Sequence, residues 1–416
     1  MTRRVLLASL NAGGGHHALR DSFAAALTRV DPARERVEPV VWNSADRFID
    51  WFYSVCVRFL PRFQGKIVEL SSQPWALRTA MTLSPQLHAE GTALLRAQRF
   101  DLLLSTHPVQ AITFTRVRRA LGFSTPIVCA VPDYGVPASG YYPPLPEIRP
   151  DALIVMEETT LEHYRGLGVP EDRLHLSGFL TREPFVRVGA RLRAEDRDTV
   201  RAALRAEVAA AHPEFAGFVL SRPTVLFLGG SAWTAKTGPV LDAVLSDPAL
   251  REAANVVVVA GRDRVFESRL RARSREGLHV FGFVAPEVLA ALMGLADVPV
   301  LGSLAPATLQ ELLEVGLGPL LLFHFIPGSE RHHVGYIQSQ RLGLYAPSTA
   351  DMLGLVREAL GLVPASTRLA TARDGFRERA RLLRSRSVER ALQLPRFLER
   401  MVESPRFSQD GARAVG

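Results

Sequence analysis

Short apolar runs alternate with longer amphipathic segments along almost the whole chain. The apolar runs are continuous rather than alternating, which is typical of strands buried on both faces of a parallel sheet. The segments between them have helical spacing, and the repeated strand and helix order predicts an α/β fold. The predicted strands are residues 5–10, 39–42, 101–106, 126–131, 152–156, 174–178, 224–230, 255–261, 278–283, 297–302 and 317–325.

The pattern divides the chain into two halves, because a charged, helix-like stretch without a strand precedes Thr224. We predict two Rossmann-like, doubly wound domains, residues 1–190 and 191–365, that face each other across a cleft. Residues 366–416 are predicted to form a helical segment that packs back toward the first domain. Because doubly wound sheets bind ligands at the carboxyl ends of their strands, we expect the functional loops there.

Composition narrows the class of protein. Hydrophobic residues make up 47% of the 416 residues and charged residues 22%, as in globular proteins. The longest apolar stretch is shorter than the roughly 20 residues that a membrane-spanning helix needs. The chain does not open with a signal-peptide pattern, so we expect a cytoplasmic protein. Cys56 and Cys129 have no metal-ligand spacing around them and are predicted to be buried small hydrophobes.

The net charge of +8 comes mostly from arginine. Two interpretations stay open: solvated faces of amphipathic helices, or attraction to anionic lipid headgroups or nucleic acid. The arginines are spread over many predicted helices and form no recognisable nucleic-acid-binding module. We therefore expect no nucleic-acid partner.

Three glycines and two histidines, residues 13–17, lie between a predicted strand and a predicted helix. Glycines there permit a tight turn and a close approach of a ligand to the helix N-terminus. The spacing is neither that of a dinucleotide fingerprint nor that of an ATP-binding phosphate loop. His16, in the first helical turn, is expected to have its pKa lowered by the helix dipole and to act as a neutral general base. The alternative is a tight turn with capping histidines.

A second strand, glycine turn and helix occur at Gly229, Gly230 and Ser231. Further along, Thr308 lies near a predicted helix start and Glu311 follows one turn later. A carboxylate there can accept hydrogen bonds from both ribose hydroxyls while the helix N-terminus faces a diphosphate. The alternative for Glu311 is an ordinary acid favoured by the helix dipole.

The order of the motifs resembles the glycosyltransferases that make monogalactosyl- and glucosyl-diacylglycerol. More distantly, it resembles the transferase that adds N-acetylglucosamine to the lipid-linked peptidoglycan precursor. The resemblance implies the two-domain GT-B fold and an inverting, metal-independent transfer of a hexosyl group from a UDP-sugar to a lipid hydroxyl, with diacylglycerol as the expected acceptor. It implies no cofactor besides the UDP-sugar donor. The matching segments are residues 11–17, 105–110, 132–135, 177–185, 226–231, 257–263, 280–284, 296–297, 308–322 and 326–333.

The resemblance also assigns roles to residues in both domains. His16 would take the proton of the acceptor hydroxyl, with His107 and Asp133 at cleft positions of the first domain. The second domain would bind the nucleotide-sugar, with Phe283 beginning the segment at the uracil and Glu311 at the ribose. The expected nucleotide-sugar-binding residues are Gly14, Gly15, Gly229, Gly230, Ser231, Arg262, Phe283, Val284, Thr308, Glu311, Gly328, Ser329 and Glu330.

The chain departs from the family pattern in the loop before Glu311. The family has Lys-x-Gly-Pro-Gly-Thr there, whereas residues 303–308 read Ser-Leu-Ala-Pro-Ala-Thr. Two alanines in place of glycines limit how near the backbone approaches a phosphate. Ser329 replaces a glutamine of the family, His333 an asparagine and Ala138 a histidine. These differences leave open a membrane-associated binding protein that has lost turnover.

Residues 47–81 interleave aromatic with basic side chains. This mixture is typical of a segment that lies in a membrane interface, and members of the family dock on membranes through this region. The alternative is that the aromatics pack against the first sheet as core. We expect a peripheral protein on the anionic inner face of the cell membrane. The predicted membrane-facing residues are Trp51, Phe52, Tyr53, Phe59, Phe63 and Trp75.

A nucleotide-sugar epimerase with the same architecture is a further alternative. It would act without a lipid acceptor and would therefore need no aromatic and basic segment. The three hypotheses differ in their products, because only the transferase makes a glycolipid.

Overall fold

A computed structural model describes most of the chain, and its described residues form two compact units. Unit 1 comprises the described residues of Met1–Cys56, Leu60–Thr181 and Ser385–Gly416, and unit 2 those of Arg182–Arg384. The described residues are 2–10, 14–44, 46, 51, 55–56, 63, 66, 73, 75, 85–137, 139–229, 237–273, 275–326 and 330–404.

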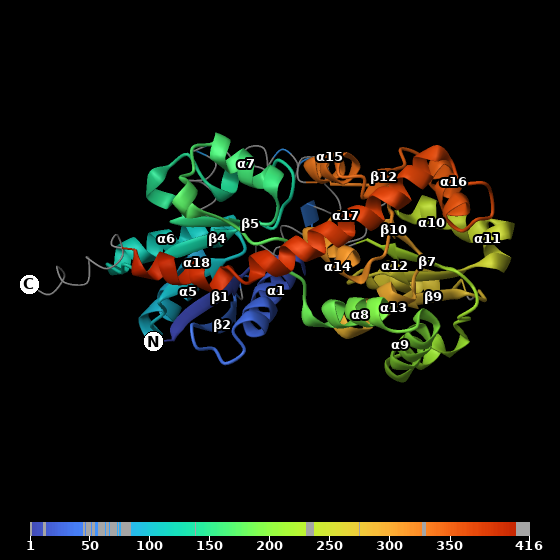
Figure 1. The fold of residues 1–416 in the computed structure, drawn as a ribbon, viewed down its shortest axis with the longest axis horizontal. Coiled ribbons are helices and arrows are strands. Elements are labelled where there is room, and N and C mark those ends of the chain that lie inside the picture. Colours follow the sequence, from blue (N-terminus) through green and yellow to red (C-terminus); the bar gives the residue numbers. More distant parts are fainter. Residues whose placement is uncertain are drawn as a thin grey trace, which may run out of the picture. The chain divides into compact units, whose positions relative to one another are not determined.

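The described part of unit 1 contains a six-stranded sheet in the order β2-β1-β3-β4-β5-β6 (Figure 1). All neighbouring strands are parallel, and β3, β4, β5 and most of β1 are buried because both faces are covered by helices and loops. The strands are β1 (Arg3–Ser9), β2 (Val37–Asn43), β3 (Leu102–Ser105), β4 (Ile127–Ala130), β5 (Ala152–Val155) and β6 (Leu174–Leu176).

Local sequence signals set the helix ends of unit 1. For example, α6 begins after His107, whose ring caps the helix, with Pro108 at the first position, and it ends at Gly122, whose φ of 69° is left-handed. The helices are α1 (Gly14–Val30), α5 (Pro85–Ala97), α6 (Pro108–Leu121), α7 (Glu158–Gly166) and α18 (Leu394–Glu403), with short 3-10 helices η1 (Ser139–Tyr141), η2 (Pro146–Ile148) and η3 (Glu171–Arg173).

Unit 2 repeats this architecture with a different strand order. Its described residues form a six-stranded parallel sheet in the order β12-β11-β10-β7-β8-β9, which is the Rossmann order (Figure 1). The strands are β7 (Thr224–Leu228), β8 (Asn255–Val259), β9 (Leu278–Phe281), β10 (Val298–Leu301), β11 (Leu320–Leu322) and β12 (Gly343–Tyr345).

Helices follow the strands of unit 2, as the sequence pattern predicts. The longest, α17 (Thr367–Ala391), crosses the division between the units after Arg384. The others are α8 (Glu183–Ala194), α9 (Arg197–Ala211), α10 (Thr237–Ser246), α11 (Pro248–Ala253), α12 (Arg264–Arg271), α13 (Pro286–Leu295), α14 (Pro306–Val315), α15 (Arg331–Ser339) and α16 (Thr349–Ala359), with one 3-10 helix, η4 (Pro213–Gly217).

The last turns of α17 and the helix α18 belong to the core of unit 1. The ring of Phe397 in α18 stacks on His175 in β6, with ring centroids 4.5 Å apart. Ser387 in α17 accepts a hydrogen bond at 2.8 Å from the backbone N–H of Phe179, and Gly178 is needed there because a Cβ on it would lie 2.6 Å from the Cα of Ser387. The segment therefore closes the β6 edge of the first sheet.

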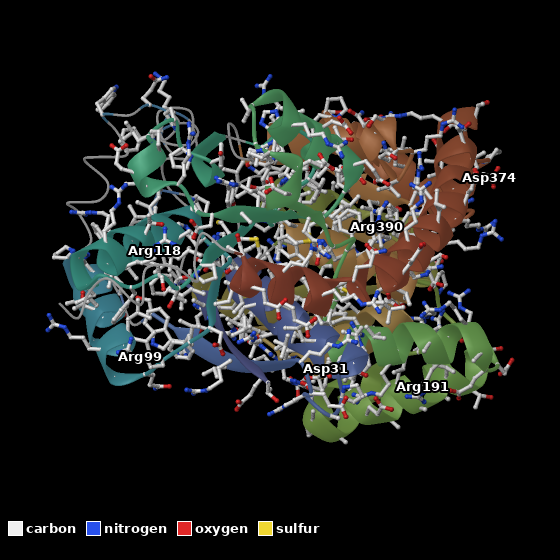
Figure 2. All side chains as sticks on the ribbon, turned by 60° about the vertical axis from the view of Figure 1, so that its left-hand side comes forward. Asp31, Arg99, Arg118, Arg191, Asp374 and Arg390 are labelled. Atoms are coloured by element: carbon white, nitrogen blue, oxygen red, sulfur yellow. The ribbon has the colours of Figure 1, made fainter. Side chains whose placement is uncertain are left out.

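Arginines take part in ion pairs on both units. Arg118 pairs with Asp151, and Arg390 pairs with Glu158 (Figure 2 labels both arginines). Other charged side chains, such as Asp374, are exposed on helices. These contacts give some of the arginines structural partners within the protein. Both cysteines are buried and free, as predicted.

None of the helices in the described parts of the chain combines the length and the apolar character that crossing a bilayer requires.

Each sheet has one position where the strand order reverses. In unit 1 it lies between β1 and β3, and in unit 2 between β7 and β10. The loops at the carboxyl ends of two such strands diverge to opposite faces of the sheet and leave a crevice, which is where doubly wound sheets bind ligands. The search for functional residues therefore starts at the ends of these four strands.

Candidate functional site

The histidine site, as we name His16, Thr106, His107 and Asp133, lies at the reversal of unit 1. α1 follows β1, and its first described residues are Gly14 and Gly15, so these glycines belong to the helix rather than to a turn before it. This corrects the predicted helix start. Among the described residues, a Cβ on either glycine would meet no atom within 4 Å, so packing against this part of the chain does not require glycine here.

His16 is held by backbone atoms of the loop after β3. Its Nδ1 lies 2.6 Å from the carbonyl oxygen of Thr106, and the Thr106 hydroxyl donates to the carbonyl oxygen of His16 at 3.1 Å. Because a carbonyl only accepts, the Nδ1 of His16 must carry the proton. Its Nε2 is therefore the basic nitrogen of the neutral ring.

Burial lowers the pKa of His16, and this is the largest influence on it. The hydrogen bond to Thr106 and the charge of Asp133 act in the opposite direction and raise the pKa. The predicted lowering is found, but its main cause is desolvation rather than the helix dipole. At neutral pH the ring is neutral, as a general base must be.

His107 lies against His16, with ring centroids 4.5 Å apart in an edge-on arrangement. The Nδ1 of His107 accepts a hydrogen bond at 3.2 Å from the N–H of Val109 and so caps α6. This contact fixes the proton of the neutral ring on Nε2. Burial and the neighbouring His16 hold the pKa of His107 well below its usual range, so it does not compete for the proton.

Asp133 follows β4 and supplies the negative charge of the histidine site. The hydroxyl of Tyr141 donates to it at 3.1 Å. Burial and the adjacent Asp133 hold the pKa of Tyr141 well above its usual range, which keeps the hydroxyl a donor. Asp133 raises the pKa of both His16 and His107, so it stabilises a proton that arrives at the site.

His17 has a different environment from His16. Its Nδ1 lies 2.7 Å from the hydroxyl of Ser9, which donates to Asn43 at 2.7 Å and accepts from Arg20 at 2.9 Å. These contacts fasten the first turns of α1 to the ends of β1 and β2. The second histidine of the pair therefore anchors the helix that carries the first.

The glutamate site, as we name Arg182, Thr308 and Glu311, lies at the reversal of unit 2. β7 ends beside the buried Gly229, and α14 follows β10. The N-cap of α14 is Ala305, whose side chain has no hydrogen-bond acceptor, so the N-cap residue gives this helix no side-chain cap. Thr308 lies in this first turn, as predicted.

Glu311 is buried, 3% exposed, and pairs with Arg182. The Nε of Arg182 donates to Oε1 of Glu311 at 2.9 Å, and a second guanidinium nitrogen donates to the same oxygen. Burial raises the pKa of Glu311, and the charge and hydrogen bonds of Arg182 lower it. Glu311 is thus more than a surface acid favoured by the helix dipole, because it is a desolvated carboxyl with a dedicated counter-ion.

Glu330 connects two loops of unit 2. Its carboxylate accepts from the Ser303 hydroxyl at 2.8 Å, from the N–H of Leu304 at 3.1 Å and from the N–H of Ile326 at 2.7 Å. The loop that departs from the pattern of the resembled family is thus fastened through the hydroxyl of Ser303. A contact between Glu330 and a sugar stays a prediction, since protein donors already occupy both of its oxygens.

Phe283 follows β9 and is 67% exposed, whereas Val284 is buried. The guanidinium of Arg262 lies over the Phe283 ring at 5.1 Å. An exposed aromatic ring held by a cation offers a flat apolar surface to a base. The remaining predicted donor-binding residues, Gly230, Ser231, Gly328 and Ser329, lie outside the described residues.

Three of the predicted membrane-facing aromatics are described: Trp51, Phe63 and Trp75 are 60%, 51% and 59% exposed. Side chains this exposed are not core, which removes the alternative interpretation for these three. Phe52, Tyr53 and Phe59 lie outside the described residues.

Sequence reasoning did not single out two residues that the structure brings into these sites. They are Thr106 and Arg182. Each lies inside a segment that carried the family resemblance, but their contacts join parts of the chain that are distant in sequence, such as residues 182 and 311. Their positions within the motif segments were a signal for these residues, but the sequence does not show which residues they contact.

Comparison with known proteins supports a glycosyltransferase fold. No protein-family model matches the chain. A probable chloroplastic monogalactosyldiacylglycerol synthase 3 from Oryza sativa subsp. japonica is 30% identical over 144 residues, which cover 33% of this chain. The matched part spans only 28% of that relative's length.

Solved structures resemble the chain over nearly its whole length. The glycotransferase of kitacinnamycin has a TM-score of 0.57 at 14% identity, covering 97% of this chain and 100% of its own. Arabidopsis thaliana UGT89C1 in complex with UDP-L-rhamnose has a TM-score of 0.57 at 13% identity, with coverage of 97% and 100%. UDP-GlcNAc 2-epimerase from Neisseria meningitidis bound to UDP-GlcNAc has a TM-score of 0.55 at 12% identity, with coverage of 92% and 98%. These likenesses show the fold, which is the predicted two-domain GT-B fold.

Proposed function

We propose that the protein transfers a hexosyl group from a UDP-sugar to a hydroxyl of a membrane lipid, with diacylglycerol as the leading acceptor. The observation that carries this proposal is the state of His16, a neutral imidazole at a strand-order reversal whose Nε2 is left as the basic nitrogen. The partial match to a probable monogalactosyldiacylglycerol synthase supports the acceptor class. The GT-B fold supports the reaction class.

The reaction is a single displacement. Nε2 of His16 takes the proton of the acceptor hydroxyl while its oxygen forms a bond to the anomeric carbon of the sugar. The bond between that carbon and the diphosphate oxygen breaks, UDP leaves with the electron pair, and the configuration inverts. The imidazolium formed on His16 is stabilised by the Thr106 carbonyl and by the charge of Asp133.

We assign donor binding to unit 2. The N-terminus of α14 suits the diphosphate, because the positive end of the helix dipole stabilises the charge on the leaving group. Glu311 suits the ribose hydroxyls and Phe283 the uracil ring. That the transfer needs no metal ion stays a prediction.

We assign contact with the membrane to the segment that contains Trp51, Phe63 and Trp75. Their exposure supports this assignment, since an interfacial segment must present aromatic rings to the lipid. Binding to anionic liposomes measured by co-sedimentation tests it. We expect binding that weakens with added salt, and a protein that stays in the supernatant would contradict it.

An epimerase is the second candidate, favoured by the likeness to UDP-GlcNAc 2-epimerase. One assay separates the candidates: purified protein is incubated with UDP-sugars and lipid acceptors, and products are identified by mass and by the configuration of the nucleotide-sugar. A glycosylated lipid supports the transferase. A changed nucleotide-sugar without any acceptor supports the epimerase, and UDP-sugar binding without either product supports a binding protein that has lost turnover.

A further inference from the structure

Two contacts hold Arg182 in place. Its guanidinium lies over the ring of Phe185 at 4.9 Å, and Phe185 is fully buried in α8. The guanidinium also meets Glu311 of α14 with two donors. Its position therefore follows from the packing of α8 against α14, which is so close that a Cβ on Gly189 would lie 2.3 Å from the carbonyl oxygen of Glu314.

We propose that Arg182 is a positioning residue, which holds Glu311 as an oriented carboxylate with its second oxygen left for the ribose hydroxyls of the donor. This inference rests on the proposed function, because it takes a uridine nucleotide as the ligand of unit 2. It adds a residue to the donor site and states what that residue does.

The geometry of the pair separates the two carboxylate oxygens. Both donors of Arg182 meet Oε1, and among the described residues none donates a hydrogen bond to Oε2. A buried carboxylate with an unused oxygen provides an acceptor for a ligand hydroxyl. A pairing that engaged both oxygens would have left the ribose without this acceptor.

The charge of Arg182 is needed because burial favours the neutral form of Glu311. A neutral carboxyl presents a donor as well as an acceptor, and it accepts hydrogen bonds more weakly than the ion. Removing the guanidinium would therefore raise the pKa of Glu311 further. The site would then bind ribose well only at a pH high enough to ionise the acid.

Several of the other charged groups on the elements packed against α14 have partners of their own. In α8, Arg191 pairs with Glu207, and Arg193 pairs with Glu314. Arg384 of α17 donates to the carbonyl oxygen of Leu313. The remaining ones are Glu183 and Arg187 in α8 and Glu287 in α13. Of all these groups and Arg182, Arg182 is the one that acts on the pKa of Glu311.

A direct contact between Arg182 and the diphosphate is the competing explanation, since arginine binds phosphate well. The two explanations differ in the part of the ligand that Arg182 serves. If Arg182 serves the ribose, its removal weakens the binding of UDP and of uridine equally. The removal then has no effect on a nucleotide that lacks the ribose hydroxyls. If Arg182 contacts the diphosphate, its removal weakens the binding of UDP and leaves the binding of uridine unchanged.

The test measures the affinity of the full chain for UDP, uridine and 2′,3′-dideoxyuridine diphosphate by calorimetry or ligand-observed NMR. The variants are Arg182→Met, Arg182→Lys and Glu311→Gln, with Arg191→Met as a control that removes a paired arginine of the same helix. We expect Arg182→Met to weaken UDP and uridine alike, by about 10-fold at neutral pH, and to leave the dideoxy compound unaffected. Arg182→Lys keeps the charge and should lose about 3-fold or less.

The pH dependence gives a second readout that a structural defect would not produce. The affinity of Arg182→Met for UDP should recover as the pH rises above neutral, because Glu311 then ionises. Glu311→Gln has no carboxyl, so its affinity should stay low and flat. Circular dichroism confirms that the variants are folded, and if Arg182→Met is not, Arg182→Lys and Glu311→Gln carry the same comparison.

Different results of these measurements would overturn either the role of Arg182 or the proposed function. Loss of UDP binding with unchanged uridine binding in Arg182→Met overturns the positioning role in favour of a phosphate contact and leaves the proposed function standing. An equal loss for all three ligands without recovery at high pH shows a structural role and also overturns the inference. A wild-type protein that binds neither UDP nor uridine overturns the proposed function itself.

Discussion

In unit 1 a histidine at the strand-order reversal is held by backbone carbonyls, whereas in unit 2 a glutamate at the corresponding place is held by an arginine side chain. Nδ1 of His16 donates to the Thr106 carbonyl, and Oε1 of Glu311 accepts from Arg182. Both residues are desolvated, and both follow the same kind of strand end.

The difference follows from what burial does to each group. Burial lowers the pKa of His16 and raises that of Glu311, so in each case it favours the neutral form. The neutral form is the useful one for a general base, and a carbonyl is enough to orient it. The ionised form is the useful one for ribose binding, so Glu311 needs a counter-ion. Burial therefore requires a carbonyl beside His16 but a positive charge beside Glu311.

The largest effect is expected when the base of unit 1 is removed. His16→Ala should lower kcat by about 10²- to 10⁴-fold, as is typical of a general base, and should leave the affinity for UDP unchanged. Product formation under saturating donor, with UDP titrations, measures both. His88→Ala in α5 is the matched control. A kcat close to that of the wild type would remove His16 from the reaction.

Gly189→Ala tests the packing on which the glutamate site depends. The new Cβ would lie 2.3 Å from the carbonyl oxygen of Glu314, so α8 and α14 must move apart. We expect a loss of about 2 to 3 kcal/mol in the free energy of unfolding, measured in urea, and weaker UDP binding.

The matched control is Gly166→Ala in α7 of unit 1, where a Cβ would meet no atom within 4 Å. This variant should be neutral or slightly more stable, because alanine favours the helix. Equal stability of the two variants would contradict the close packing of α8 and α14.

Glu330→Gln tests the connection between the two loops of unit 2. Glutamine keeps one acceptor oxygen but lacks the second, so at least one of the three hydrogen bonds is lost. We expect a loss of about 1 to 2 kcal/mol in the free energy of unfolding, partly offset because a buried charge is also removed. Ser303→Ala loses one donor and should cost less. A larger loss in Ser303→Ala than in Glu330→Gln would contradict this account.

The sequence pattern was sufficient for most of the fold. Eleven strands were predicted, and each has a counterpart in the structure, since continuous apolar runs between helices leave little choice. The exception is β12 (Gly343–Tyr345), which is too short and too little apolar to stand out. The start of α1 was placed too late, because glycine is as common in turns as at helix ends.

The sites were only partly predictable. His16 and Glu311 were found because they follow strand ends in recognisable motifs. Their supports were missed, because Thr106 acts mainly through its carbonyl oxygen, which every residue has, and Arg182 is paired across a large distance in sequence. Patterns along the chain identify a reactive group more readily than the groups that control its ionisation.

Thr106→Val tests the weaker half of the contact that holds His16. It removes the hydroxyl that donates to the His16 carbonyl and keeps the carbonyl that accepts from Nδ1. We expect a loss of about 1 kcal/mol in the free energy of unfolding and a several-fold fall in kcat, with wild-type values restored by Thr106→Ser. If Thr106→Ser behaves like Thr106→Val, shape rather than the hydroxyl is what the site requires.

The smallest effect is expected at Asp133, as a shift in pH dependence. As the base, His16 works in its neutral form, so kcat/KM should rise with pH through a pKa below the usual 6.5 and level off near neutral pH. The charge of Asp133 raises that pKa, so Asp133→Asn should move the acid limb to lower pH by less than about 1 unit. Tyr141→Phe removes the donor to Asp133 without changing the charge and should leave the limb nearly in place. A limb that moved to higher pH in Asp133→Asn would mean that the variant raises the pKa of His16. The main role of Asp133 would then be to keep His16 buried rather than to stabilise its proton.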